Sequence, residues 1–241
     1  VIVNRIWTAH FGMGIVNTPS EFGAQGERPT HPALLDDLAA RFIESGWSMK
    51  WLHREILFSA VYRQASGKPP AGDPGLRLYS RFPHKRLEVE QWRDALLSVT
   101  GTLDLAMGGP AVDLGLASNN RRTVYGLVKR REINDLLRLH DFPDPVTHSP
   151  VRIPTTTPLQ QLFILNSPLF LQQAQALHKR LASECADTPG RIHRAYRLLY
   201  GRAPNGAELR LAEAYLAGNT ERDWRGYLQM LLGANEFLFT D

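Results

Sequence analysis

The sequence predicts a mainly α fold: a multi-helix globular domain with a Pro-rich extended middle segment and at most a short strand or hairpin. Two observations favour this fold class. Apolar residues recur at intervals of three and four positions along most of the chain, which is the spacing of one helix face. Helix-capping residues precede many of these stretches, often with proline at the next position, and glycine often follows them.

Three helices are expected within residues 1–60. The first ends at Gly12, the second begins at Pro32 and ends at Gly46, and the third follows Ser48 as its N-cap. Their apolar faces consist of Val3, Ile6, Trp7, Phe11, Leu34, Leu35, Leu38, Phe42, Trp51, Leu52, Ile56 and Phe58.

The middle of the chain is expected to contain one strong helix, one short strand and one extended segment. The helix has an apolar stripe at 3,4,3,4 spacing, made of Val89, Trp92, Leu96, Val99 and Leu103. Residues 122–129 are rich in β-branched and aromatic side chains, which predicts a short strand. Residues 141–157 contain four prolines and are expected to run extended.

The last third reads as a series of helices with clear start signals. Thr157 with Gln160 and Asn205 with Glu208 form capping boxes, and Ser167 precedes a proline. Further helices are expected from Thr188 to Gly201 and over a final apolar stretch that contains Trp224, Tyr227, Leu228, Leu231 and Phe237. We expect an N-terminal helical region over 1–145 and a C-terminal helical subdomain over 146–241, or one continuous domain.

Composition excludes several protein classes. The 241 residues are 43% hydrophobic and 22% charged, which argues against a disordered tail or a collagen-like chain. No apolar run approaches the roughly 18 residues of a membrane helix. The chain begins with Val1 and carries no signal peptide, so we interpret it as a piece of a longer protein.

The net charge of +4 is mildly basic, and arginine greatly outnumbers lysine. Arginine binds carboxylates and phosphates in a bidentate manner, so this bias fits either anion binding or structural ion pairs. One dense basic cluster stands out, and it consists of Arg121, Arg122, Lys129, Arg130 and Arg131. It is the basis of a nucleic-acid-binding hypothesis, which is the least favoured of the three.

The sequence holds no phosphate-binding loop, no G-x-S-x-G motif and no H-E-x-x-H motif. The lone Cys185 excludes an intrachain disulfide and a C-x-x-C-H haem attachment. The segment with His140, Asp141, Asp144 and His148 could ligate a divalent ion only if it folds back on itself, and turn formation is the favoured interpretation. We therefore expect no metal and no cofactor in this chain.

Glu90 and Asp94 lie four residues apart and share one helix face. Such a pair suits general acid–base catalysis if one pKa is raised. Arg86 and Arg93 lie close in sequence and would keep both carboxylates ionised, so a structural ion-pair network is the favoured interpretation.

Many spaced motifs occur in one order along nearly the whole chain. They include residues 3–7, 11–16, 30–36, 46–50, 59–64, 86–95, 108–110, 122–125, 141–144, 152–156, 165–168, 200–204 and 235–238. In this order the chain resembles the planctomycete cytochrome-C-associated domain of unknown function, a PSD-type domain. It departs from that family's pattern at Gly75, where asparagine is frequent, and at Asp37, where tryptophan is frequent.

The resemblance implies a place in large exported multidomain proteins, C-terminal to a second planctomycete domain and often to a cytochrome-c-like segment. It implies a periplasmic or otherwise extracytoplasmic location, and it implies no established activity. The haem motif belongs to the cytochrome-like part, so redox activity is not transferred to this chain.

Three functional hypotheses follow. The first is a non-catalytic helical interaction module whose partners are neighbouring domains or other exported proteins, which favours a role other than an enzyme. The second is a carbohydrate- or anion-binding or enzymatic module with an Arg/carboxylate cleft. Its candidate cluster consists of Asn4, Trp7, His31, Glu90, Arg93, Asp94, Arg122, Tyr125 and Arg152. The third is the nucleic-acid binder.

Overall fold

A computed structural model describes residues 1–240. The chain divides into two compact units: unit 1 comprises Val1–Lys85 with Thr240, and unit 2 comprises Arg86–Phe239. We expected a boundary near residue 145, whereas this division falls between residues 85 and 86. The Pro-rich segment lies within unit 2 because its side chains bind α4 and α6, as described below.

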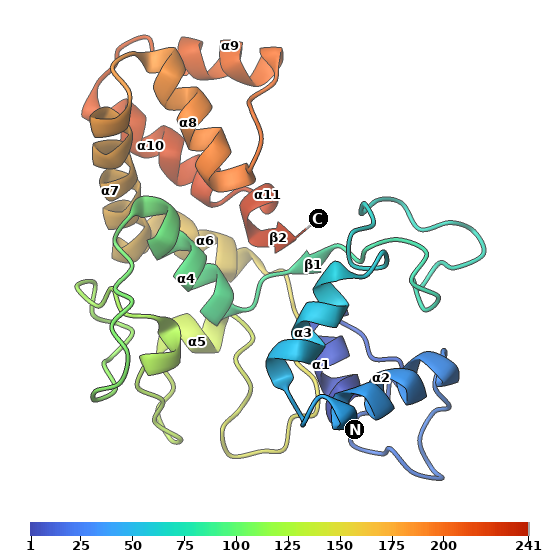
Figure 1. The fold of residues 1–241 in the computed structure, drawn as a ribbon. Helices are drawn as coiled ribbons and strands as arrows, with labels where there is room; N and C mark the ends of the chain where they lie inside the picture. Colours follow the sequence, from blue (N-terminus) through green and yellow to red (C-terminus); the bar gives the residue numbers. More distant parts are fainter. Residues whose placement is uncertain (241) are drawn as a thin grey trace. The chain divides into compact units, whose positions relative to one another are not determined.

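Unit 1 is built from three helices, α1 (Ile2–Phe11), α2 (Pro32–Glu44) and α3 (Met49–Phe58) (Figure 1). All three expected helices are confirmed. Ser48 Oγ accepts from Trp51 N at the start of α3, and Gly12 ends α1 with φ 76°, a value that glycine adopts without a Cβ clash. Their apolar faces form one core, whose buried members include Val3, Trp7, Phe11, Leu38, Phe42, Leu52 and Ile56.

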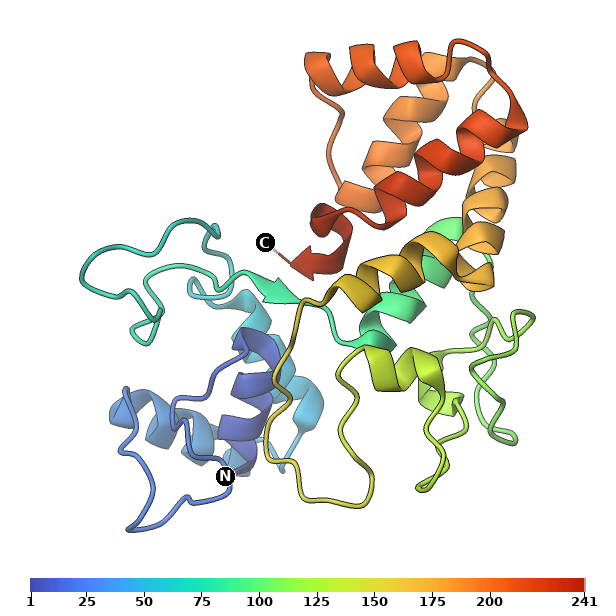
Figure 2. The ribbon, with the colours of Figure 1, turned by 180° about the vertical axis from the view of Figure 1, so that it is seen from behind.

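Unit 2 contains α4 (Val89–Thr100), the 3₁₀ turn η1 (Thr123–Tyr125), α5 (Asp135–Leu139), α6 (Pro158–Asn166), α7 (Pro168–Glu184), α8 (Thr188–Tyr200), α9 (Gly206–Tyr215), α10 (Glu221–Leu232) and α11 (Asn235–Leu238). The helix α7 packs against α4, α6, α8 and α10 (Figures 1 and 2). The fully buried residues of α7 include Phe170, Ala174, Leu177 and Leu181, which recur at helical spacing.

The fold class is confirmed: the chain is mainly α, and the strands within residues 1–240 are the two-residue β1 (Lys85–Arg86) and β2 (Phe239–Thr240), which pair with each other. No helix in the described part of the chain combines the length and the apolar character needed to cross a membrane.

Three local expectations were wrong. The predicted strand at 122–129 is instead the turn η1, because the side chain of Asp94 binds the first residue of that turn. The stripe of α4 ends before Leu103, since Gly101 terminates the helix with φ 77°. The final helix is divided into α10 and α11 at Gly233 and Ala234. Residues 141–157 contain no helix or strand, as expected.

Candidate functional site

The N-terminal half of α4 presents charged side chains to two long loops of unit 2. The helix starts with a capping box, in which Glu88 N–H donates to Gln91 Oε1 at 3.3 Å. Helical spacing then places Glu90, Arg93 and Asp94 so that they bind residues 119–123 and Arg152. These contacts fix the positions of the loops around the candidate site.

Arg93 is fully buried, with 0% of its surface exposed. One guanidinium nitrogen donates to the backbone carbonyl of Arg121 at 2.8 Å and to Thr123 Oγ1 at 3.1 Å, and the other donates to the carbonyl of Asn119. Burial lowers the pKa of Arg93, and nearby Asp94 opposes this effect. Since both terminal guanidinium nitrogens donate to backbone and hydroxyl acceptors of the loop and the side chain is buried, Arg93 fixes residues 119–123 and is closed to an external ligand.

Asp94 holds the first residue of η1. Its Oδ1 accepts from Thr123 N and from Thr123 Oγ1, both at 2.7 Å, and its Oδ2 lies 3.8 Å from Arg122 Nε. The carboxylate therefore acts as the cap of the turn, as acidic side chains do at helix starts.

Glu90 forms a bidentate ion pair with Arg152 of the Pro-rich segment. The two guanidinium nitrogens donate to the two carboxylate oxygens at 2.7 and 2.8 Å, and Glu88 lies 3.1 Å from the same guanidinium. Although burial alone would raise the pKa of Glu90, the hydrogen bonds and charge of Arg152 hold that pKa below its ordinary value. Arg152 also lies over the ring of Phe142, 5.1 Å from its centroid.

Glu90 and Asp94 are both ion-paired, but their partners are not the expected Arg86 and Arg93. Glu90 pairs with Arg152, which is 62 residues away in sequence, and Asp94 binds Thr123 and Arg122. The prediction rested on closeness in sequence, but Arg86 lies before α4 and binds the Pro-rich segment and α6 instead.

Arg86 forms a second network that sequence reasoning missed. Its guanidinium donates to the carbonyl of Thr155 and to Gln160 Oε1, and Gln160 is fully buried. Asp141 accepts from Thr155 N at 2.8 Å and from Thr155 Oγ1 at 2.6 Å. Asp141 and Thr155 thus close the neck of a loop over residues 142–154, an arrangement typical of an Ω-loop. The sequence signal for this network was Gln160, which is recognised in the sequence only as part of a helix capping box.

A pocket of about 420 Å³ lies where these parts of unit 2 meet. Its charged members are Glu88, Glu90 and Arg152. Its other lining residues are Leu114, Thr123, Val124, Gly126, Val128, Leu137 and Phe142. The volume and the mixture of apolar walls with a few polar groups are typical of ligand pockets.

The remaining candidate residues have structural contacts of their own. Asn4, 0% exposed, donates from Nδ2 to Val16 O at 2.9 Å and accepts from Val16 N at 2.8 Å. Trp7 is buried in the core of unit 1, and His31 precedes α2 with Nδ1 3.0 Å from Thr30 Oγ1. In unit 2, the ring of Tyr125 lies under the guanidinium of Arg121 at 4.4 Å. Asn4, Trp7 and Arg93 are buried, so they do not line an open cleft.

The proposed metal-ligand and basic clusters are also engaged in the fold. His140 Nδ1 lies 2.8 Å from Leu136 O and its ring stacks on Trp92, while Asp141 binds Thr155. Across residues 1–240, no group of three or more His, Cys, Asp or Glu side chains is placed to hold a metal ion.

In the basic cluster, Arg121 donates to the carbonyls of Ala106, Gly108 and Pro110. Its guanidinium therefore organises the preceding loop, which leaves fewer of its N–H donors free to bind an anion.

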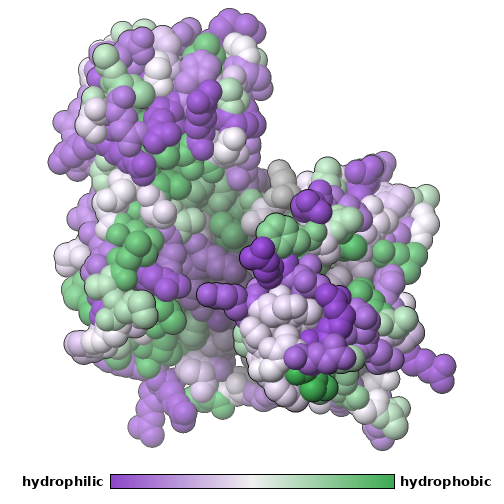
Figure 3. Space-filling model, in the orientation of Figure 1, coloured by the Kyte–Doolittle hydropathy of each residue, from purple (hydrophilic) through white to green (hydrophobic). Residues whose placement is uncertain are grey.

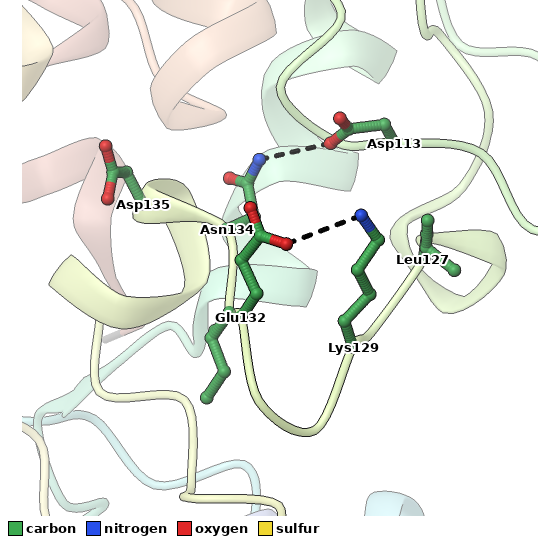
Figure 4. A pocket seen from close by; sticks show the side chains of 7 residues that line it. Asp113, Leu127, Lys129, Glu132, Asn134 and Asp135 are labelled. Carbon is green, nitrogen blue, oxygen red and sulfur yellow. Dashed lines mark hydrogen bonds and ion pairs between the residues drawn. The ribbon is translucent and has the colours of Figure 1, made fainter.

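A second pocket of about 300 Å³ has an acidic lining (Figure 4). Its Lys129 pairs with Glu132 at 3.6 Å, and Asn134 Nδ2 donates to Asp113 Oδ1 at 3.2 Å. Asp113 Oδ1 also accepts from Gly115 N, so these polar groups stabilise the turn before α5. We therefore place the candidate site in the larger pocket beside α4.

Comparisons with known proteins place the chain in a family. No curated protein and no solved structure matched it. The family model PSD1, described as "Protein of unknown function (DUF1553)", matches residues 1–216 of the 241. The match covers the whole of unit 1 apart from Thr240 and reaches through α9 of unit 2. The chain therefore belongs to the PSD1 (DUF1553) family of proteins of unknown function.

Proposed function

We propose that this chain is a non-catalytic helical interaction module of a larger exported multidomain protein, with a neighbouring domain of that protein as its partner. The expectation of a planctomycete, cytochrome-associated protein in an extracytoplasmic compartment is part of this proposal. The chain itself carries no cofactor in this account, since any haem belongs to the cytochrome-like part.

One observation carries the proposal: the charged residues of α4 that would serve catalysis are already bound within unit 2. Arg93 donates to loop carbonyls, Asp94 caps Thr123, and Glu90 is held by Arg152. A general acid at neutral pH needs a raised pKa, whereas Arg152 keeps the pKa of Glu90 low. The cluster therefore suits a scaffold that fixes loops for recognition.

Exposed apolar side chains in the same loops support a binding role. Val124, 67% exposed, lines the pocket beside α4, and Val146 and Ile153 are exposed in the loop that supplies Arg152. Figure 3 shows hydrophobic surface, in green, among the polar surface over the part of unit 2 that contains α4 and α5. Exposed apolar side chains that gather beside a pocket are typical of protein interaction sites.

An anion- or carbohydrate-binding function has less support. The guanidinium of Arg152, which would bind an anion, is already neutralised by Glu90 and lies beside Glu88. An incoming carboxylate or sulfate would have to displace one of these partners and would meet the repulsion of the other.

The proposal is tested by calorimetric titration of this chain with the separately purified domain that precedes it in its own full-length protein. We expect saturable binding that Val124→Asp weakens at least tenfold, because the substitution places a charge in the apolar contact. Leu211→Asp is the matched control: Leu211 is 73% exposed on α9, away from the pocket lining, and its substitution should leave the affinity unchanged. Absence of binding, or an equal effect of both substitutions, would overturn the proposal.

A further inference from the structure

The pocket beside α4 offers more negative charge than its own residues neutralise. We propose that it is the receptor for an alkylammonium group, and that the natural ligand is a lysine side chain on the partner domain. This inference rests on the proposed function and adds the chemistry by which the partner is recognised.

The charge balance of the lining is the first argument. Two carboxylates, Glu88 and Glu90, face one guanidinium, Arg152, so the charged lining has a net charge of −1. The side chain of Glu88 is 41% exposed, while those of Glu90 and Arg152 are about a quarter exposed, 28% and 27%. Glu88, which lies farther from Arg152 than Glu90 does, is therefore the carboxylate more open to solvent. A cation that pairs with Glu88 loses little of its hydration.

The shape of the lining is the second argument. Apolar side chains from three separate segments surround the charged group: Leu114, Val124, Val128, Leu137 and Phe142. A lysine has an apolar four-carbon stem that packs on such walls while its charged end reaches the carboxylates. A compact inorganic cation would leave these walls unused, and a neutral alkyl chain would leave the net charge of −1 on the two glutamates and Arg152 unbalanced.

The geometry around Arg152 favours ammonium over a second guanidinium. Arg152 already occupies both oxygens of Glu90 in the planar, bidentate arrangement that guanidinium groups form with carboxylates. A second guanidinium finds no free bidentate face on Glu90, nor on Glu88, whose carboxylate accepts from the Gln91 N–H in the capping box and lies 3.1 Å from Arg152. An ammonium with three rotatable donors needs only single oxygen contacts, so it can bind Glu88 beside the existing pair.

The first test uses small probes and isothermal titration of the whole chain. We expect n-pentylamine and Nα-acetyl-lysine amide to bind, and the neutral counterparts n-pentanol and Nα-acetyl-norleucine amide to bind at least tenfold more weakly. Glu88→Gln should weaken the binding of both amines at least fivefold. Glu213→Gln, which removes an exposed charge on α9, should leave it unchanged. Equal binding of charged and neutral probes, or no effect of Glu88→Gln, would overturn the inference.

A second arm identifies the source of the ammonium group. Reductive methylation of one sample of the partner domain and acetylation of another separate retained charge from lost charge on its lysines, because only acetylation removes the charge. We expect the affinity of the chain to fall at least tenfold with the acetylated domain and to change much less with the methylated one. If pentylamine binds tenfold more tightly than acetyl-lysine amide, a free amine is the ligand and the lysine assignment is wrong.

The outcomes also separate this inference from the proposed function. If the partner domain binds with unchanged affinity to the Glu88→Gln variant and no amine binds, the interaction module stands and the lysine receptor fails. If amines bind in a Glu88-dependent manner but no neighbouring domain does, the interaction module fails. A circular-dichroism melting curve of each variant confirms that it is folded before its binding is compared.

Discussion

Arg152 donates to both carboxylate oxygens of Glu90, at 2.7 and 2.8 Å, although the two residues lie 62 positions apart in the sequence. This ion pair ties the loop over residues 142–154 to the first turn of α4, and Glu88 lies beside it. The pocket that we propose as the recognition site exists only while this loop is held in place, because Phe142 and Arg152 form part of its lining.

We predict that Arg152→Met lowers the free energy of unfolding by about 1–2 kcal/mol, since the pair is half-buried and part of its strength is screened by solvent. Arg152→Lys should recover less than half of the loss, because an ammonium cannot bind both oxygens of Glu90 in the same plane. Urea unfolding of the single and double variants with Glu90→Gln measures the coupling between the two residues. Additive effects would mean that the pair contributes nothing to the fold.

Arg93 should be far less tolerant of substitution. Arg93→Met leaves the carbonyls of Asn119 and Arg121 and the hydroxyl of Thr123 without their donor, in a place from which water is excluded. We expect a loss of about 3 kcal/mol or more in unfolding free energy. Hydrogen exchange of the backbone amides over residues 119–126 should accelerate more than that of α9. A variant that melts at the wild-type temperature would contradict this role.

Asn4 offers an isosteric test in unit 1. Its amide donates to Val16 O and accepts from Val16 N, and the nearby Gly14 leaves room for it: a Cβ there would come within 2.8 Å of Asn4 Nδ2. Asn4→Asp keeps the acceptor, loses the donor and buries a carboxylate. We expect a loss of about 2–4 kcal/mol at pH 7 that becomes smaller as the pH falls and the carboxyl takes up a proton. A pH-independent loss would show that the buried charge is not the cause.

The pair of His10 and His53 predicts acid sensitivity. His10 Nε2 lies 2.8 Å from His53 Nδ1, so one ring donates a hydrogen bond and the other accepts it through an unprotonated nitrogen. Burial lowers the pKa of His10 below the ordinary 6.5, and the charges of His53 and Lys85 lower it further; the ring of Tyr62 also faces it. Burial likewise lowers the pKa of His140.

The direction in which stability changes with pH follows from these lowered pKa values. Well above pH 6.5 the rings of His10 and His140 are neutral in both the folded and the unfolded chain, and their contribution to stability is complete. As the pH falls below 6.5, the unfolded chain takes up protons first, so the free energy of unfolding decreases. Urea unfolding between pH 7.5 and 5 measures the slope. His53→Gln, which keeps an acceptor for His10, should make the slope shallower, and an unchanged slope would contradict this origin.

The sequence allowed the helices to be predicted well because their signals are local. Ser48, Thr157 and Asn205 each accept backbone hydrogen bonds at a helix start, as expected from the residue type alone. The strand at 122–129 was wrong because Asp94, almost thirty positions earlier, bends that segment into η1. Local propensity carries no information about such a long-range hydrogen bond.

The candidate site was predictable only in part. Glu90 and Arg152 were identified from the sequence and line the pocket beside α4, whereas Glu88 was not, and Arg93 and Asp94 bind the loop over residues 119–123 instead. The pairing of Glu90 with Arg152, however, depends on how a Pro-rich loop folds back, which no spacing rule describes. Asn4 and Trp7 are buried in unit 1. Burial and internal hydrogen bonding, rather than contact with a ligand, explain their residue types.

The most direct measurement is hydrogen–deuterium exchange of this chain, alone and with the neighbouring domain that we propose as its partner. We predict that the partner protects the amides of residues 123–128 and 142–154, two segments that contribute residues to the pocket lining, and leaves α9 unchanged. Protection confined to other parts of the chain, or no protection at a saturating concentration of the partner, would contradict the claim that this site in unit 2 is the recognition surface.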